Sequence, residues 1–156
     1  MTDDDLLALC VWSEAAGEPY EGEVAISRVV HNRMAAHFMS DGTVAGTVLH
    51  YPAFSGFWFA MHAGKYTRVA WTPADAEARA ETMLADAKAQ TATWARCQRA
   101  AADGAPGSAF AGGPQWQALA AEPRALDYAN LRLCTPTWLP RVTQVAVIGH
   151  HTFFKE

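Results

Sequence analysis

The sequence Val11-Trp12-Ser13-Glu14-Ala15-Ala16-Gly17-Glu18-Pro19-Tyr20-Glu21-Gly22 joins two apolar segments of helical period through an abrupt break. Before the break, the spacing of apolar residues predicts a helix that is capped by Asp3 or Asp4 and ends at about residue 16. Gly17 is expected to be the first residue beyond that helix, and Pro19 prevents the helix from continuing. The break therefore separates a first helix from a second one.

The middle of the chain is also largely helical by pattern. The second helix, over residues 21–38, is apolar on more than one side, so we expect it to be central and buried. Residues 41–71 are rich in Gly, His and aromatic residues, which indicates loops with short strands or turns that shape a site. A Thr-Pro-Ala-Asp start at residues 72–75 predicts a helix to about residue 102, interrupted near residue 90.

The last third of the chain changes period. A short helix is predicted over residues 115–121. The β-branched run 142–148 predicts a strand, which a turn at residues 149–150 connects to a second strand over 151–154. A chain of 156 residues suits one domain. We expect residues 1–156 to form a single α+β domain, mostly helical, with a small C-terminal β element.

Composition and charge exclude several classes of protein. With 51% apolar and 18% charged residues the chain is globular. Its net charge is −4 and its basic residues are dispersed, so we expect no nucleic-acid partner. No apolar run approaches the roughly 20 residues that span a bilayer, so we expect no stable membrane insertion. We also expect the chain to be a monomer. The acidic N-terminus lacks the basic start of a secretory signal, which predicts synthesis in the cytoplasm without a signal peptide.

Neither the cysteines nor the histidines have the spacing of a metal site. Cys10, Cys97 and Cys134 are odd in number and widely separated, which favours buried thiols over a disulfide framework or zinc site. His150 and His151 are adjacent, but the chain has no H-E-x-x-H motif, and on a strand only one of the pair faces a site. We therefore expect no metal and no cofactor.

Glu14 is the candidate catalytic residue. It lies at the negative C-terminal end of the first helix, in an all-acid segment that includes Glu18 and Glu21, and both effects raise a carboxyl pKa. Partial burial beside Trp12 acts in the same direction. A carboxyl that stays protonated near neutral pH suits cleavage of a glycosidic bond, because the leaving oxygen must receive a proton. A solvated Glu at a helix end is the competing interpretation, and composition alone favours it.

The other chemical candidates are weaker. Glu21 and Glu23 are most simply charges at a helix N-terminus, and Glu18 serves the turn, so no clear second carboxylate emerges for a two-acid glycosidase. Ser55 does not lie in a G-x-S-x-G elbow, and Cys10 lies within an apolar helix. Neither indicates an activated nucleophile.

Aromatic residues and the last histidine admit two interpretations. Tyr128, next to Asp127, either bonds to substrate or flanks a turn. For His151 we favour packing or hydrogen bonding over catalysis. Four tryptophans are expected to be core residues rather than sugar-binding platforms: Trp58, Trp71, Trp116 and Trp138.

Taken in order, these motifs resemble those of the SleB/CwlJ-type cell-wall hydrolases. That family opens with an E-A-R-G-E-P-x-x-G turn and a helix ending in N-R, continues with F-S and A-T-H-Y, and closes with P-x-W and I-G-x-H-x-F-Y. The corresponding segments here are residues 14–22, 32–33, 54–55, 125–128, 136–138 and 148–154. The resemblance covers most of the chain except residues 103–123.

The resemblance implies a lysozyme-like fold related to lytic transglycosylases, with one essential acid, the first Glu of the signature. That position is Glu14, which its charge environment had already singled out. The family acts on peptidoglycan, between N-acetylmuramic acid and N-acetylglucosamine. Ser55, Tyr128 and His151 match positions that line or support the substrate cleft.

Three residues depart from the family pattern: Ala16 replaces an Arg, Asp127 replaces a His and Phe154 replaces a Tyr. These changes alter hydrogen bonding in the cleft but leave the acid in place. A catalytic domain without a leader or wall-binding module resembles a bacteriophage endolysin. We therefore expect a role in bacterial cell lysis, with action on the wall after the membrane is permeabilised.

Because one acid is found, we favour lytic transglycosylase chemistry. In that reaction the muramoyl 6-hydroxyl attacks the anomeric carbon, while Glu14 protonates the leaving oxygen and then deprotonates the hydroxyl. Three alternatives stay open: a muramidase that hydrolyses the same bond, an N-acetylmuramoyl amidase, and a non-catalytic glycan-binding protein. Ala16 and Asp127 keep the last of these open.

Overall fold

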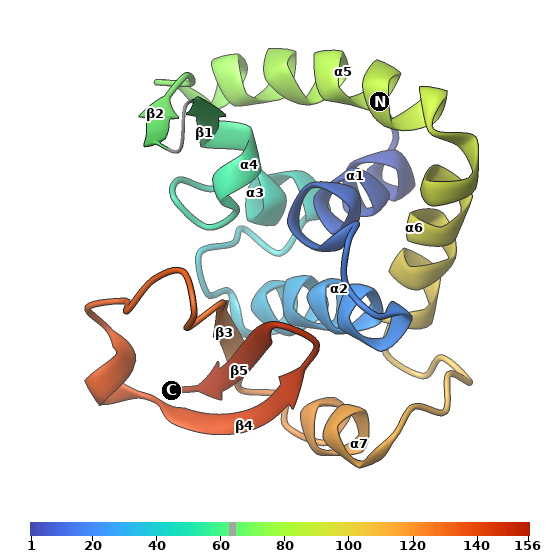
Figure 1. Cartoon of the computed structure of the whole chain (residues 1–156), viewed down its shortest axis with the longest axis vertical. Coiled ribbons are helices and arrows are strands. Elements are labelled where there is room, and N and C mark those ends of the chain that lie inside the picture. Colours follow the sequence, from blue (N-terminus) through green and yellow to red (C-terminus); the bar gives the residue numbers. More distant parts are fainter. Residues whose placement is uncertain (63–64) are drawn as a thin grey trace.

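The computed structural model describes residues 1–62 and 65–156, and its architecture is helical with two small sheets (Figure 1). The helices are α1 (Asp3–Ala15), α2 (Tyr20–Ala36), α3 (Val44–Val48), α4 (Ser55–Trp58), α5 (Pro73–Ala89), α6 (Thr91–Asp103) and α7 (Pro114–Ala120), with a 3-10 turn η1 (Leu139–Arg141). The strands are β1 (Phe59–His62), β2 (Lys65–Arg68), β3 (Ala125–Ala129), β4 (Thr143–Ile148) and β5 (His151–Lys155). The predicted α+β class is confirmed.

Helix α2 lies at the centre of the molecule, as its pattern predicted. Side chains on several of its faces are buried, among them Val24, Ile26 and Val30. Helices α1 and α6 pack against it on one side, and strand β3 with helix α7 on the other (Figure 1). Because α2 contacts both groups, it fixes α1 relative to the C-terminal sheet.

Helix α1 begins with a cap that differs from the prediction. The Thr2 hydroxyl accepts a hydrogen bond from the Asp5 backbone N–H at 3.1 Å, so neither Asp3 nor Asp4 is the cap. The aspartates occupy the first turn instead, where the positive end of the helix dipole stabilises them. At the other end, Gly17 lies beyond the helix as predicted, after the cap residue Ala16.

The long predicted helix over residues 72–102 is two helices, α5 and α6, that meet at Gln90 as predicted. Thr72 and Asp75 form a capping box: the Thr72 hydroxyl accepts from Asp75 N–H at 3.2 Å, and the Asp75 carboxylate accepts from Thr72 N–H at 2.9 Å. Pro73 occupies the first helical position, where its missing N–H costs nothing. None of the helices in the described ranges is both long and apolar enough to cross a bilayer.

The C-terminal sheet has the antiparallel order β3-β5-β4. Ile148 pairs with His151 across a two-residue turn, in which Gly149 has a left-handed φ of 61°. Strand β3 was not predicted, because four of its five residues are buried and no alternation of polar and apolar residues marks it. Likewise residues 41–71 contain the short helices α3 and α4 as well as the expected strands.

Several side chains differ in exposure from the prediction. Cys134 is exposed rather than buried, because it lies in the surface loop that follows β3. Trp71 is exposed and Trp138 is only half-buried, so the core assignment of both was wrong. The buried assignment is confirmed for Trp58, Trp116, Cys10 and Cys97.

Candidate active site

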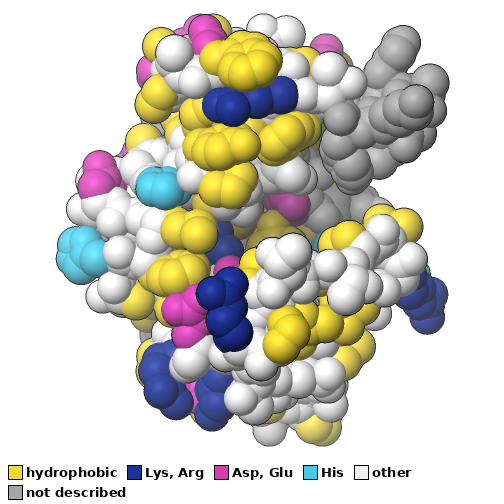
Figure 2. Space-filling model, turned by 90° about the vertical axis from the view of Figure 1, so that its left-hand side faces the viewer, with side chains coloured by type: hydrophobic (Ala, Val, Ile, Leu, Met, Phe, Trp, Pro, Cys, Tyr) yellow, Lys and Arg dark blue, Asp and Glu magenta, His cyan; other side chains and the backbone are white. Residues whose placement is uncertain are grey.

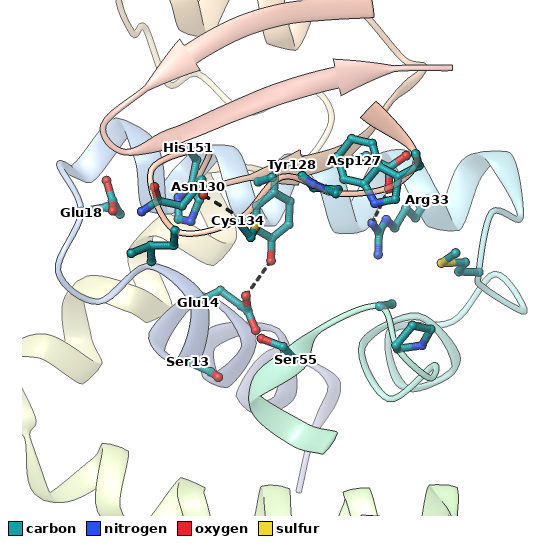
Figure 3. Close-up of a pocket in the computed structure, with 17 residues that line it drawn as sticks. Ser13, Glu14, Glu18, Arg33, Ser55, Asp127, Tyr128, Asn130, Cys134 and His151 are labelled. Carbon is teal, nitrogen blue, oxygen red and sulfur yellow. Dashed lines mark hydrogen bonds and ion pairs between the residues drawn. The ribbon is translucent and has the colours of Figure 1, made fainter. Parts of the chain in front are cut away.

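A cleft of about 610 Å³ opens between the end of α1, the segment that leads into α4, and the loop after β3. On the face that Figure 2 shows, a hollow lies beneath a group of hydrophobic side chains, and an acidic side chain is visible inside it. The cleft is lined by all four residues that the sequence put forward: Glu14, Ser55, Tyr128 and His151. They come from α1, α4, β3 and β5, so the fold brings distant segments together (Figure 3).

Glu14 is held at the floor of the cleft by one donor from each side. Its Oε2 accepts from the Tyr128 hydroxyl at 2.9 Å and its Oε1 accepts from the Gly56 backbone N–H at 3.2 Å. Burial raises the pKa of Glu14, and the donors together with the Arg33 charge offset only part of that rise. The direction agrees with the sequence prediction, but burial is the main cause rather than the neighbouring acids.

Gly56 allows α4 to approach α1 closely. A Cβ at this position would overlap the Ser13 hydroxyl. On its other side, the Gly56 carbonyl accepts from Arg79 Nε at 2.9 Å, and the Phe59 carbonyl accepts from Arg79 Nη2 at 3.4 Å. Arg79 on α5 therefore holds the turn whose N–H reaches Glu14. Sequence reasoning missed Gly56 and Arg79, and no motif in the sequence marks either of them.

Tyr128 and His151 form the opposite side of the site. Their rings meet edge-on with centroids 5.2 Å apart, and Tyr128 also packs against Phe153 at 5.9 Å. Burial and the nearby Glu14 raise the pKa of Tyr128 far above its ordinary value, so its hydroxyl stays a donor. Burial lowers the pKa of His151, so its ring is neutral at pH 7, and its buried Nδ1 has no hydrogen-bond partner within the described part of the chain.

Ser55 begins helix α4 beside the acid. Figure 3 shows its side chain pointing toward Glu14 across the cleft. The hydroxyl contributes to lowering the pKa of Glu14, less than burial raises it. Ser55 therefore lies where it can contact both the acid and a bound ligand.

Asp127, which stands where the family pattern has His, pairs with a buried arginine. Its Oδ1 lies 3.1 Å from Arg33 Nη2, and Arg33 Nε also donates to the Leu126 carbonyl at 2.6 Å. Burial raises the pKa of Asp127, while Arg33 acts to lower it. The guanidinium lies 5.0 Å from the centroid of the Phe54 ring. This departure from the pattern is therefore accommodated by an ion pair at the edge of the cleft.

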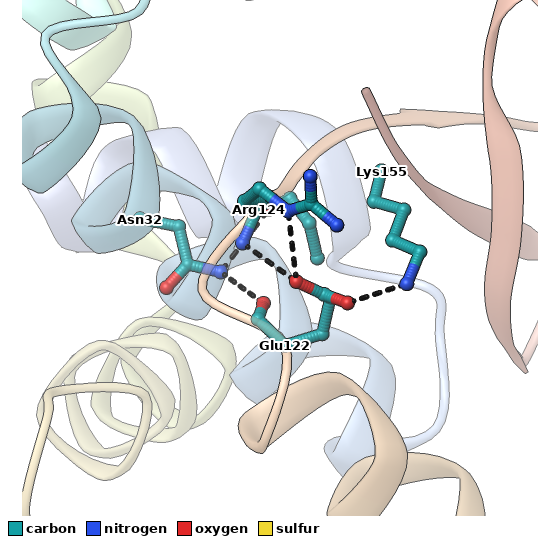
Figure 4. A network of polar contacts seen from close by, with 5 residues as sticks. Asn32, Glu122, Arg124 and Lys155 are labelled. Atoms are coloured by element: carbon teal, nitrogen blue, oxygen red, sulfur yellow. Dashed lines mark hydrogen bonds and ion pairs between the residues drawn. The ribbon is translucent and has the colours of Figure 1, made fainter.

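Asn32, next to Arg33, ties α2 to the chain just before β3 (Figure 4). Its Nδ2 donates to the carbonyls of Glu122 at 3.3 Å and Ala125 at 3.1 Å. The Glu122 carboxylate in turn lies 2.8 Å from Lys155 Nζ at the end of β5. The N-R motif thus fixes the position of β3, which carries Tyr128, and it pointed to this part of the site together with the motif at residues 125–128.

Glu18 joins the opening motif of the sequence to the closing one. Its two carboxylate oxygens accept from the His150 backbone N–H at 2.8 Å and lie 2.9 Å from His150 Nδ1. A Cβ at Gly149 would overlap the Glu18 carboxylate, so only glycine fits there. Burial raises the pKa of Glu18, but the two contacts to His150 outweigh it, and the net pKa is lowered. Glu18 lines the cleft as an ionised group that is engaged by the hairpin.

A second recess of about 430 Å³ lies next to the cleft and shares Ser13 and Ser55 with it. Ala16, which stands where the family pattern has Arg, opens onto this recess. Arg79 lines the same recess from α5. A guanidinium is therefore present there although position 16 carries none.

Comparison with known sequences gives a short but clear match. No protein-family model matches the chain. Over 53 residues, 34% of this chain, it is 43% identical to the spore cortex-lytic enzyme of Oceanobacillus iheyensis and 45% identical to that of Bacillus subtilis. The matched segment spans 19% and 17% of those proteins, less than a fifth of their length.

Comparison with solved structures extends the match to nearly the whole chain. The catalytic domain of the germination-specific lytic transglycosylase SleB from Bacillus anthracis superimposes with a TM-score of 0.60 and 25% identity, covering 98% of this chain and 93% of that one. The catalytic domain of Bacillus cereus SleB gives a TM-score of 0.59 and 24% identity, covering 98% and 89%.

The fold is therefore that of the lysozyme-like catalytic domains, built here around a cleft with a half-buried acid. Within that class, the sequence match and the two superpositions support the resemblance to SleB/CwlJ-type cell-wall hydrolases that the sequence motifs indicated. The fold expected from those motifs is confirmed.

Proposed function

We propose that this chain is a peptidoglycan lytic transglycosylase that cleaves the bond between N-acetylmuramic acid and N-acetylglucosamine, with Glu14 as its one proton-transferring carboxyl. The observation that carries the proposal is the setting of Glu14. It is a carboxyl of raised pKa at the floor of a cleft, and it accepts a hydrogen bond from each side of that cleft. The Bacillus anthracis structural neighbour is named as a lytic transglycosylase, which supports the same chemistry.

The reaction needs one group that first gives and then takes a proton. Protonated Glu14 donates its proton to the glycosidic oxygen, and the bond from the muramoyl C1 to that oxygen breaks. The muramoyl 6-hydroxyl then attacks C1, and the Glu14 carboxylate removes the hydroxyl proton. A 1,6-anhydro ring forms, Glu14 regains its starting proton, and no water is consumed. Because the nucleophile belongs to the substrate, attack is intramolecular.

Two donors and the burial of Glu14 suit the two halves of this cycle. The donors Tyr128 and Gly56 stabilise the carboxylate that exists between the two proton transfers. Burial favours the protonated form before and after. Burial and the two donors therefore act in opposite directions on the proton affinity of Glu14, which suits a group that must both give and take a proton.

Ser55 and His151 are proposed to bind the sugar. The His151 ring is neutral and lines the cleft, so it can contact a sugar that binds there without adding a charge. Ser55 lies beside Glu14 on the other side, where its hydroxyl can donate or accept. Tyr128 is shared between the acid and the substrate face.

The decisive experiment is digestion of purified peptidoglycan by wild type and by Glu14→Gln. Gln is close in shape but cannot transfer the proton, so we expect a fall in turnover of about a thousandfold. Glu77→Gln, which changes an exposed glutamate on α5, is the matched control and should retain activity. Mass spectrometry should find muramoyl ends one water lighter than reducing ends. Full activity of Glu14→Gln would refute the proposal.

Hydrolysis by a muramidase is the second candidate, because Glu18 lines the same cleft in its ionised form. Its two oxygens are engaged by His150, which leaves it poorly placed to activate water. Reducing muramic ends, abolished in Glu18→Gln, would establish hydrolysis in place of transglycosylation. Anhydro ends from both wild type and Glu18→Gln would reject it.

We also propose that the natural target is the wall of growing bacteria, reached after the membrane is permeabilised. The sequence-matched relatives are named for the spore cortex, so the two settings must be tested side by side. Permeabilised vegetative cells and decoated spores are compared for loss of turbidity. Clearing of the cells supports bacterial lysis, and clearing of the spores alone contradicts it.

A further inference from the structure

An exposed aromatic cluster lies on the wall above the catalytic cleft. It consists of Tyr51, Arg68 and Trp71, which we call the aromatic shelf. The Arg68 guanidinium lies 4.3 Å from the Tyr51 ring centroid and 4.5 Å from that of Trp71, so the cation is held between two rings. Trp71 is 69% exposed and Tyr51 is 42% exposed. Figure 2 shows hydrophobic side chains gathered around a basic one above the hollow.

The shelf is ordered by contacts beneath it. Tyr51 packs edge-on against the buried Trp58 at 5.1 Å and lies 6.3 Å from the Phe59 ring. Arg68 Nε donates to the Ala70 carbonyl at 2.9 Å, which fixes the guanidinium between the rings. Both rings therefore present their exposed surfaces in a fixed arrangement. Binding of a ligand there costs little side-chain conformational entropy. Exposed rings that are gathered around one side chain, rather than scattered singly, are typical of interaction sites.

The shelf adjoins residues that line the catalytic cleft and the second recess. Tyr51 is followed directly by Pro52 and Ala53, which line the catalytic cleft. Its neighbour Phe59 lines the second recess. A linear polymer that leaves the cleft past Pro52 and Ala53 therefore runs toward the shelf.

We propose that the aromatic shelf binds a sugar ring of the same peptidoglycan strand, outside the catalytic cleft. The proposal rests on the function proposed above, which supplies the polymer. One face of a pyranose ring presents only C–H groups, which carry partial positive charge and fit the negative face of an aromatic ring. The exposed Trp71 ring offers that face, and Arg68 adds a positive charge that complements the carboxylates of a peptidoglycan strand.

Binding at the shelf has a kinetic consequence that separates it from the catalytic site. The shelf contacts sugars that do not react, so it stabilises the bound strand and its transition state equally. Loss of the shelf should therefore raise KM for long strands and leave kcat unchanged. Short oligosaccharides that end inside the cleft should show no change.

The test measures binding without turnover. Trp71→Ala is made in a Glu14→Gln background, and affinity for purified glycan strands of defined length is measured by calorimetry. We expect affinity for long strands to fall about tenfold, and affinity for short oligosaccharides to stay the same. Val147→Ala, an exposed apolar residue on β4, is the control. Thermal unfolding checks that Trp71→Ala remains folded, as its exposure predicts.

Each outcome decides the question. Equal affinity of Trp71→Ala and its parent for long strands would refute sugar binding at the shelf. The proposed function would still stand in that case if the enzyme with Glu14 intact released anhydro products. Loss of both long-strand and short-strand binding would place Trp71 in the cleft itself and also overturn it. Loss of binding to phosphatidylglycerol vesicles, or of self-association, with glycan binding unchanged, would assign the surface to a membrane or a second copy instead.

Discussion

The two walls that hold Glu14 are built very differently. On one side Tyr128 lies on β3, where the backbone ladder to β5 and the rings of Phe153 and His151 brace it. On the other side Gly56 lies in a helix of four residues, and Arg79 holds it from behind. Each wall supplies one hydrogen bond to the carboxyl, at 2.9 Å and 3.2 Å.

The difference shows how one carboxyl is tuned from two directions. Burial by both walls raises the pKa of Glu14, and each donor lowers it by stabilising the carboxylate. The sheet wall is redundant, because several contacts fix Tyr128. The helix wall depends on one glycine and one arginine. Changes to the helix wall should therefore disturb mainly the geometry, and changes to the sheet wall should disturb mainly the proton affinity of Glu14.

The largest effect is expected where the helix wall has no room to adjust. In Gly56→Ala the new methyl group would overlap the Ser13 hydroxyl, so α4 must move away from α1 and take the N–H with it. A displacement of about 1 Å costs roughly a hundredfold in turnover. Turnover on peptidoglycan is the measurement, with circular dichroism to confirm folding. Ser13→Ala in the Gly56→Ala background should recover part of the activity, and no recovery would show that the clash is not the cause.

A smaller effect with a different signature is expected on the sheet wall. Tyr128→Phe keeps the ring packing but removes the hydroxyl that donates to Glu14. Hydrogen bonds to charged groups contribute about 1.5–3 kcal/mol, so the carboxylate is destabilised and the pKa of Glu14 rises further. Since Glu14 must start protonated, the alkaline limb of the kcat profile should move to higher pH, while kcat falls about tenfold. An unmoved alkaline limb would refute the role of this bond.

Arg79 should act on the acid only through Gly56. Arg79→Met removes the bonds to the Gly56 and Phe59 carbonyls, which loosens the turn without creating a clash. The Gly56 N–H then donates less well, so the alkaline limb should shift upward less than in Tyr128→Phe, with a loss in kcat of about threefold. Lys88→Met removes a positive charge from the same helix and should change neither quantity. If both variants shift the profile equally, the effect is one of net charge.

Local signals in the sequence were sufficient for most of the fold. The capping box at Thr72 and the turn at Gly149 act over a few residues, so their patterns were readable. Strand β3 was missed because it is buried on both faces and lacks the alternation that marks a strand. The Thr2 cap was missed because three aspartates that follow it are equally good caps by type.

The site residues also divide into those that a local sequence pattern marked and those that only the packing of distant segments revealed. Glu14 was found because its neighbours in sequence are acids and a helix end, although burial proved the larger cause of its raised pKa. Gly56 reaches Glu14 across 42 residues, and Arg79 reaches Gly56 across 23. No local pattern records such contacts, and each depends on where α4 and α5 pack. The Gly56 donor and the arginine that holds it therefore required the structure, whereas Tyr128 was already a candidate from the sequence.

The smallest effect concerns the link between the opening turn and the C-terminal hairpin, which holds the sheet wall against α1. The pKa of Glu18 lies below its ordinary value of 4.5, because the contacts to His150 outweigh the opposing effect of burial. A lowered folded-state pKa means that the stabilisation is complete above the unfolded-state pKa and is lost as the pH falls through the folded-state value.

Glu18→Gln should therefore reduce the melting temperature at pH 7, and the difference from wild type should shrink as the pH falls below 4.5 and through the lowered folded-state pKa of Glu18. The His150 side of the pair is half exposed, so we expect no more than about 1 kcal/mol, or about 2–4 °C. Thermal unfolding across this pH range measures it, with Glu77→Gln as the exposed control. Parallel curves for wild type and Glu18→Gln would mean that the hairpin is held by backbone pairing alone, and that the sheet wall needs no help from the opening turn.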